Sequence, residues 1–115
     1  MAKINAKIMY DKEEDILNLS KGNPSQASIE VGDFILDIDF NGFVTAMEIL
    51  DASENLGISK EMLETLNEAC LNVSYRPNYI FIALVFKGLD KDIRIPLTVD
   101  LGHRKVEKQE ICFAR

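Results

Sequence analysis

The feature that most constrains the fold of this chain is an Asn41-Gly42 step between two alternating apolar runs. Residues 34–40 alternate apolar and polar side chains, and residues 43–50 resume the alternation after the Gly. An Asn-Gly step between such runs is a strong hairpin signal, because a type I′ turn needs positive φ at both central residues. The sequence therefore predicts an antiparallel hairpin with Asn41-Gly42 as a two-residue loop.

This two-residue loop also predicts a register. The expected pairs are Phe40 with Phe43, Ile38 with Thr45, Leu36 with Met47, and Phe34 with Ile49. Because seven of these eight residues are apolar, their shared face, including the Phe pair at the turn, is predicted to lie in the core. The opposite face is expected to meet solvent in part; it carries Ile35, Asp37, Asp39, Val44, Ala46 and Glu48.

Most of the remaining chain also has strand-like patterns. The other expected strands cover residues 3–10, 15–20, 27–31, 70–75, 79–87 and 93–99. Pro96 has no amide hydrogen for a ladder, so the last of these strands is expected at a sheet edge or at a bulge.

One main helix is expected over residues 59–68. Ser59 is a candidate N-cap, and apolar residues recur at helical spacing up to Ala69. A short helical turn is expected before it at 52–57, ended by Gly57. The predicted fold class is α+β: a curved, mostly antiparallel sheet or roll of about eight strands with the helix packed on it.

A length of 115 residues allows one domain. We expect residues 1–102 to form a single α+β domain and residues 103–115 to form a C-terminal tail. The tail has little pattern before Ile111, Cys112 and Phe113, which we expect to dock on this chain or on a partner.

Charge and hydropathy exclude several classes of partner. The net charge is −6, which repels nucleic acid and anionic membranes. No apolar run approaches the ~18 residues of a membrane span, and the N-terminal residues lack the apolar segment of a secretory leader. Cys70 and Cys112 lie far apart in the sequence with no CxxC motif. The expectation is therefore two free thiols in a cytoplasmic protein.

Two features favour self-association, most simply as a homodimer. Residues 1–68 hold 5 basic and 14 acidic side chains, whereas residues 69–115 hold 8 basic and 5 acidic ones. Such asymmetry can orient one copy against another. The run 79–86 is almost continuously apolar, and one short helix cannot cover both of its faces.

The sequence offers little catalytic chemistry. Residues 37–48 match the pattern of an EF-hand calcium loop, but their flanks are poor helices and the segment satisfies the hairpin pattern. A weaker cation site from Asp37, Asp39 and Glu48 is the alternative. His103 stands alone, and nucleophile, phosphate-loop and zinc-protease motifs are absent from the sequence. We therefore expect no enzyme activity and no cofactor.

One stretch resembles a known family. The chain is similar over about residues 4–58 to the domain-of-unknown-function 2283 family. The residues that carry the resemblance are Tyr10, Asp11, Asp15, Gly42, Glu48, Asp51, Ala52 and Ser53. Asn18, Ala46 and Asp51 depart from the usual residues of that pattern, which are Tyr, Gly and Asn. The resemblance implies a small uncharacterised protein; some members look like the antitoxin-type partner of a small toxin. It implies no catalytic role.

The motif residues also have an ordinary structural interpretation. Asp51 or Ser53 can cap the following helical turn, and Asp15 can hold the turn between the first two strands. Two functions remain: an interaction protein that self-associates or binds a partner protein in an antitoxin-like way, and a domain that binds a small ligand or a divalent cation on the acidic hairpin face. We favour the first.

Overall fold

The computed structural model describes residues 6–22, 24–88, 91–97 and 106–115. Within these ranges the chain forms nine strands and two short helices. Their bounds are β1 Lys7–Asp11, β2 Ile16–Ser20, β3 Ala27–Val31, β4 Phe34–Ile38, β5 Val44–Ile49, α1 Ala52–Leu56, α2 Lys60–Glu64, β6 Glu68–Tyr75, β7 Ile80–Phe86, β8 Lys91–Leu97 and β9 Glu107–Ala114.

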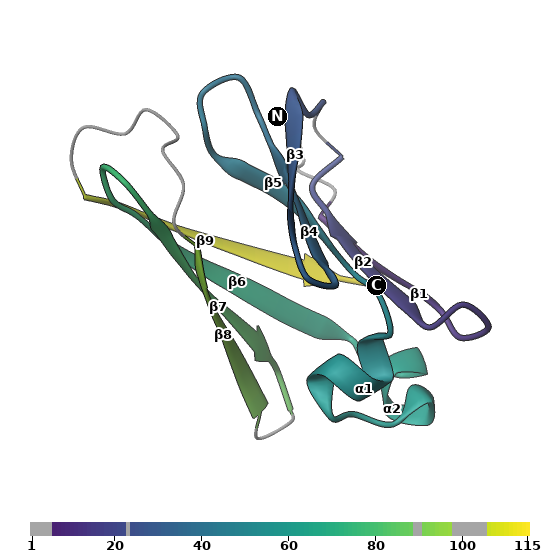
Figure 1. Ribbon diagram of the computed structural model, residues 1–115. Coiled ribbons are helices and arrows are strands. Elements are labelled where there is room, and N and C mark those ends of the chain that lie inside the picture. The colour runs from purple at the N-terminus through teal and green to yellow at the C-terminus, as the bar shows by residue number, and fades with distance from the viewer. Residues whose placement is uncertain (1–5, 23, 89–90, 98–105) are drawn as a thin grey trace, which may run out of the picture.

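The strands form a single sheet in the order β3-β4-β5-β2-β1-β9-β6-β7-β8 (Figure 1). Among the described strands, seven neighbouring pairs are antiparallel and one pair, β1 with β9, is parallel. That parallel pair joins the first five strands to the last four through one bridge, Lys7 with Ala114. The expected curved and mostly antiparallel sheet is therefore present.

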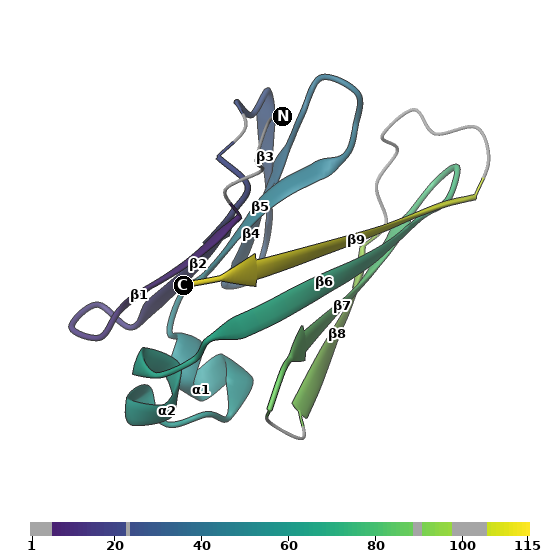
Figure 2. The ribbon, with the colours of Figure 1, turned by 180° about the vertical axis from the view of Figure 1, so that it is seen from behind.

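The sheet curls so that β1 to β5 face β6 to β9, with both helices at one end of the molecule (Figures 1 and 2). The core lies between the two facing parts. Its largest fully buried side chains come from both parts and both helices: Tyr75, Phe86, Phe113, Leu17, Leu19, Leu36, Met47, Ile49, Leu56, Leu63, Leu71 and Ile80. Curling lets one sheet build a two-layered core with little help from helices.

The C-terminal residues are part of this sheet. Residues 107–114 form β9, which pairs along its length with β6 and lies between β6 and β1. Ile111 and Phe113 point into the core. The first residues of the predicted tail, and residues 3–5 of the first predicted strand, lie outside the described residues. At the sheet margin, β8 contains Pro96 and is an edge strand, as predicted.

The prediction of one main helix over 59–68 is wrong. Ser59 does cap α2, since its hydroxyl accepts a hydrogen bond from the Met62 amide at 3.2 Å. The helix nevertheless ends at Glu64, because Thr65 closes the last turn with bonds to the Met62 and Leu63 carbonyls. Ala69, whose spacing looked helical, pairs with β7 and β9 instead. The shorter helical turn predicted at 52–57 is confirmed as α1, with Gly57 at its end.

The β4–β5 hairpin forms, but its loop differs from the prediction. Phe34 pairs with Ile49 and Leu36 with Met47, as expected, but a bulge after Asp37 places Ile38 opposite Val44. The loop is longer than two residues, because the Asp39 amide bonds the Phe43 carbonyl at 2.9 Å.

Phe40 therefore sits on the loop and is 77% exposed. Its predicted place in the core is wrong. The Asp39 carboxylate accepts hydrogen bonds from the Asn41 and Phe43 amides at 2.9 and 3.0 Å, which stabilises the longer loop. Gly42 supplies the positive φ that such a loop needs, at 83°.

The apolar run 79–86 is covered on one face by its own chain. Alternate residues of β7, from Ile80 to Phe86, are fully buried in the core. The residues between them, Phe81, Ala83 and Val85, are half-buried on the outer face. Of the helices in the described residues, none has the length and apolarity to span a bilayer.

Candidate functional site

Two of the family-pattern residues, Tyr10 and Ser53, meet at the carboxylate of a third, Asp15. Asp15 lies in the β1–β2 turn with φ at 58° and is 8% exposed. The Tyr10 hydroxyl donates to its Oδ1 at 2.6 Å, and the Ser53 hydroxyl donates to its Oδ2 at 2.6 Å. The Ser53 amide also donates to Oδ1 at 3.0 Å. One side chain thus links the first turn to the start of α1, 38 positions away.

These bonds settle the charge state of the carboxylate. Burial raises the pKa of Asp15, but the hydrogen bonds from Ser53 and Tyr10 outweigh it and leave that pKa below its usual value. Burial and the bond to Asp15 raise the pKa of the Tyr10 phenol. The pair therefore consists of an ionised acceptor and a protonated donor. An ionised carboxylate with both oxygens bonded is suited to holding structure, not to taking a proton from a substrate.

The cap of α1 differs from the prediction. Asp51 occupies the N-cap position with φ at 47°, yet its side chain makes no capping hydrogen bond. Ser53 does not cap the helix either, because its hydroxyl bonds Asp15. In place of a local cap, the Asp15 carboxylate accepts a hydrogen bond from the Ser53 amide. The backbone carbonyl of Asp15 accepts another from the Ala52 amide at 2.9 Å.

Two more family-pattern residues have local roles. Asp11 accepts a hydrogen bond from the Glu14 amide at 3.0 Å, so both Asp11 and Asp15 hold the β1–β2 turn. Glu48 lies on β5 between Asn18 of β2 and Ile35 of β4 and is half-buried.

A shallow groove follows the outer face of the β1–β2 ribbon beside this turn. Its volume is about 430 Å³, and its lining is Met9, Tyr10, Asp11, Ile16, Asn18 and Ser20. Met9 is 65% exposed there. The Asp15 carboxylate does not line the groove, whereas Asp11, a second acid of the family pattern, does.

The three hairpin acids do not gather into a cation site. The Asp37 carboxylate accepts from the Ser28 hydroxyl at 2.7 Å, and the Asp39 carboxylate holds its own loop. Within the described ranges, the candidate ligand atoms that lie close enough together for one metal ion belong to Glu68, Cys70 and Cys112, and not to the hairpin acids.

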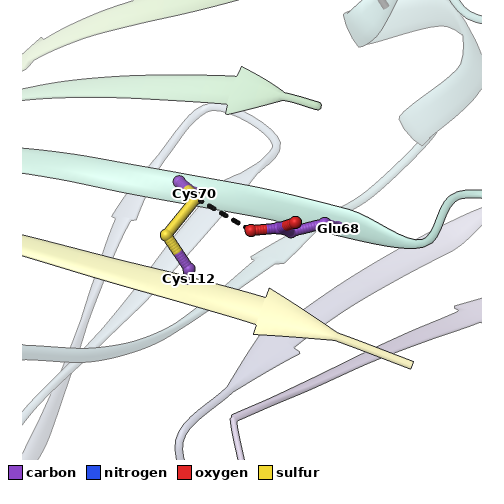
Figure 3. Close-up of side chains that lie close together, drawn as sticks. All are labelled: Glu68, Cys70 and Cys112. Carbon is purple, nitrogen blue, oxygen red and sulfur yellow. Dashed lines mark hydrogen bonds between the residues drawn. A yellow bond between two sulfur atoms is a disulfide. The ribbon is translucent and has the colours of Figure 1, made fainter. Parts of the chain in front are cut away.

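The prediction of two free thiols is wrong. Cys70 of β6 and Cys112 of β9 are directly opposite each other and form a disulfide, with Cα atoms 4.1 Å apart (Figure 3). The distance of 42 positions in the sequence hid this pairing, because nothing local showed that residues 107–114 form a strand beside β6. The alternation of Ile111, Cys112 and Phe113 was the available signal.

Glu68 lies next to this disulfide. Its Oε2 is 4.0 Å from Cys70 Sγ, along the dashed line of Figure 3. Cys70 is 1% exposed, whereas Cys112 is exposed and Glu68 is half-buried. These three residues form the Glu68–Cys70–Cys112 cluster, which the sequence did not predict.

Comparisons with known proteins support the family resemblance. Residues 7–53 match the model of a family described as a protein of unknown function (DUF2283). An uncharacterized protein of Methanocaldococcus jannaschii is 35% identical over 65 residues, which are 55% of this chain and 56% of that protein. The chain thus matches just over half of the length of this curated relative. No solved structure matches.

Proposed function

We propose that this chain is a small protein-interaction domain that self-associates through the free edge of β3. The observation that carries the proposal is that the two sheet edges differ in the residues that protect an edge from pairing. At one edge, β8 contains Pro96, which interrupts the row of amide donors. At the other edge, β3 contains neither Pro nor Lys, the residues that commonly protect edges.

Within the part of the chain that the structure describes, no strand lies beside the outer edge of β3. Its strand partner is β4, so alternate amide and carbonyl groups point away from the sheet. The two edges do not pair with each other. A cleft of about 480 Å³ lies near the end of β3, lined by Val31, Gly32, Asp33, Phe34, Asn55, Ile93 and Arg94. The side chains of Ile29 and Val31 are half-buried, and Ala27 is exposed.

A second copy fits this edge in an antiparallel arrangement centred on Ile29. Ile29 would then lie opposite the same residue of the second copy, and Ala27 opposite Val31, which extends the apolar inner face. On the outer face, Glu30 would lie opposite Ser28, so no like charges meet. Isologous pairing of this kind closes a dimer with two-fold symmetry.

The experiment is light scattering coupled to size-exclusion chromatography on two variants that add the same charge to the same strand. Ile29→Lys places two ammonium groups opposite each other at the two-fold axis and is expected to give a monomer. Ser28→Lys, the matched control, places an ammonium opposite Glu30 of the second copy and is expected to retain the dimer. Both substitutions are checked for folding by circular dichroism.

The outcomes are distinct. A dimeric wild type with a monomeric Ile29→Lys variant supports the proposal. A monomeric wild type overturns it, and equal behaviour of the two lysine variants overturns the β3 interface. If Ile29→Lys does not fold, Ala27→Lys tests the same inner face at an exposed position.

This proposal concerns binding and not catalysis. We propose the cytoplasm as the compartment in which the protein acts. An unlike protein, such as the small toxin that an antitoxin-type protein would hold, is the other possible occupant of the edge. Cation binding by Asp37, Asp39 and Glu48 is less favoured, because the carboxylates of Asp37 and Asp39 already have partners.

A further inference from the structure

The Glu68–Cys70–Cys112 cluster has a composition that a structural disulfide does not need. Its two sulfur atoms and one carboxylate oxygen all lie within 4.8 Å of one another. They come from neighbouring strands: Glu68 and Cys70 from one face of β6, and Cys112 from β9. Strands of a continuous sheet hold ligands more firmly than loops do.

The position of Glu68 is the second observation. Its Oε2 faces Cys70 Sγ at 4.0 Å, but a disulfide sulfur has no hydrogen to donate. A thiol at the same place could donate to the carboxylate, and a thiolate could share a cation with it. The carboxylate therefore suits the reduced pair better than the oxidised pair.

We propose that the reduced form of this cluster is a site for a divalent transition-metal cation of the Zn²⁺ type, and that the disulfide closes it. Cys70 Sγ, Cys112 Sγ and one oxygen of Glu68 would be the three protein ligands. Thiolate and carboxylate ligands together suit Zn²⁺ and Co²⁺, and three protein ligands leave a fourth position open. The exposed Cys112 gives the cation an entry path.

The distance expected between the two reduced sulfur atoms suits binding to one metal ion. Two sulfurs on one tetrahedral Zn²⁺, each about 2.3 Å from the metal, are about 3.8 Å apart. Two non-bonded sulfurs on directly paired residues would sit near van der Waals contact, at about the same separation. Opening the disulfide therefore needs only side-chain rotation to present both sulfurs to one ion.

The chemistry balances with a small thiol as the reductant. Two molecules of that thiol supply two electrons and two protons to the Cys70–Cys112 bond and leave joined as their own disulfide. The cation then displaces the two thiol protons when it binds the two thiolates. Oxidation by a disulfide reverses both steps and releases the cation. The cluster lies on the outer face of β6 and β9, so the proposal does not depend on self-association through β3.

The test is a titration of the full-length protein with Co²⁺, which reports thiolate ligands by a charge-transfer band and tetrahedral geometry by visible bands. The protein reduced with a phosphine and kept free of oxygen is expected to bind one equivalent, and the oxidised wild type none. The oxidised protein needs no substitution, so it remains a valid comparison if a variant fails to fold. Zn²⁺ is expected to displace Co²⁺ and to bleach both signals.

Substitutions test whether the Glu68 carboxylate and the Cys112 thiolate bind the cation directly. Glu68→Gln is expected to weaken Co²⁺ binding by the reduced protein about 10-fold or more. Glu110→Gln, the matched control, removes an equal charge from an exposed residue of β9 two positions from Cys112 and is expected to leave the affinity unchanged. Cys112→Ser, at an exposed position, is expected to abolish the charge-transfer band.

A reduced wild type without that band would overturn the metal site. Equal Co²⁺ affinity in the Glu68→Gln and Glu110→Gln variants would overturn the assignment of Glu68, and with it the three-ligand site. Unchanged Co²⁺ binding by the oxidised protein would overturn the control by the disulfide.

Discussion

Asp15 stabilises two separate pieces of local structure through one carboxylate. Asp15→Asn keeps the size of the side chain and suits a positive φ, but it removes the charge and one acceptor oxygen. We expect it to lower the free energy of unfolding by about 1–3 kcal/mol, since bonds to a buried charged acceptor are lost. Asp15→Ala should cost about 1–2 kcal/mol more, because alanine at positive φ adds strain. Urea unfolding at neutral pH measures both.

The same residue should make stability depend on pH. Because the folded-state pKa of Asp15 lies below its usual value, its contribution is complete above about pH 4 and is lost as pH falls through the folded pKa. The difference in unfolding free energy between wild type and Asp15→Asn should therefore shrink on acidification below about pH 4. A difference that stays constant down to acid pH would show that the carboxylate is not ionised in the fold.

At the scale of elements, substitutions in the β4–β5 loop can distinguish the longer loop of the structure from the two-residue turn expected from the sequence. A type I′ turn needs positive φ at both Asn41 and Gly42, but in the structure φ is positive at Gly42 alone of the two. Gly42→Ala should cost about 1–2 kcal/mol of unfolding free energy, whereas Asn41→Ala should cost less than about 0.5 kcal/mol. Phe40→Ser, at an exposed tip, should also be near neutral. Comparable losses for Gly42→Ala and Asn41→Ala in a thermal unfolding series would favour the two-residue turn.

This loop also shows where sequence reasoning succeeds and where it stops. Alternation found the strands and the register at the open end of the hairpin, where Leu36 pairs with Met47. The bulge after Asp37 could not be predicted, because it depends on the Asp39 side chain competing for loop amides. In the same way, Ala69 joins β6 instead of extending the predicted helix, since pairing with β7 and β9 outweighs a local helical pattern.

At the scale of the whole molecule, long-range pairing was the part that the sequence could not predict. Polar residues dominate the first half of β9, so its sequence lacks the apolar alternation of a strand there. The segment is recognised as a strand by its pairing between β1 and β6. The meeting of Tyr10, Asp15 and Ser53 depends on the path of the chain between β2 and α1, and the Glu68–Cys70–Cys112 cluster depends on β9. Candidate residues for local turns were therefore predictable, whereas the cluster across two distant strands was not.

One hydrogen-bond network joins the two facing parts of the sheet away from the helices. The Tyr75 hydroxyl of β6 accepts from the Val44 amide of β5 at 2.7 Å and donates to the Gln109 side chain of β9. Gln109 in turn donates to the Val44 carbonyl at 3.3 Å. Burial raises the pKa of the Tyr75 phenol, so it stays protonated and can serve as donor and acceptor at once.

Tyr75→Phe should therefore loosen one part of the sheet against the other. It leaves the Val44 amide, in a fully buried residue, without its acceptor, and we expect a loss of about 1–3 kcal/mol in unfolding free energy. Native-state hydrogen exchange should show faster exchange for amides of β5 and β9 near this network, while amides of β7, which pairs with β6 and β8, change less. Tyr79→Phe, the matched control, removes the same atom from a half-buried tyrosine at the end of the β6–β7 turn and should change neither measurement. Equal effects of the two substitutions would mean that the network does not hold the two parts together, and that the shared apolar core alone does so.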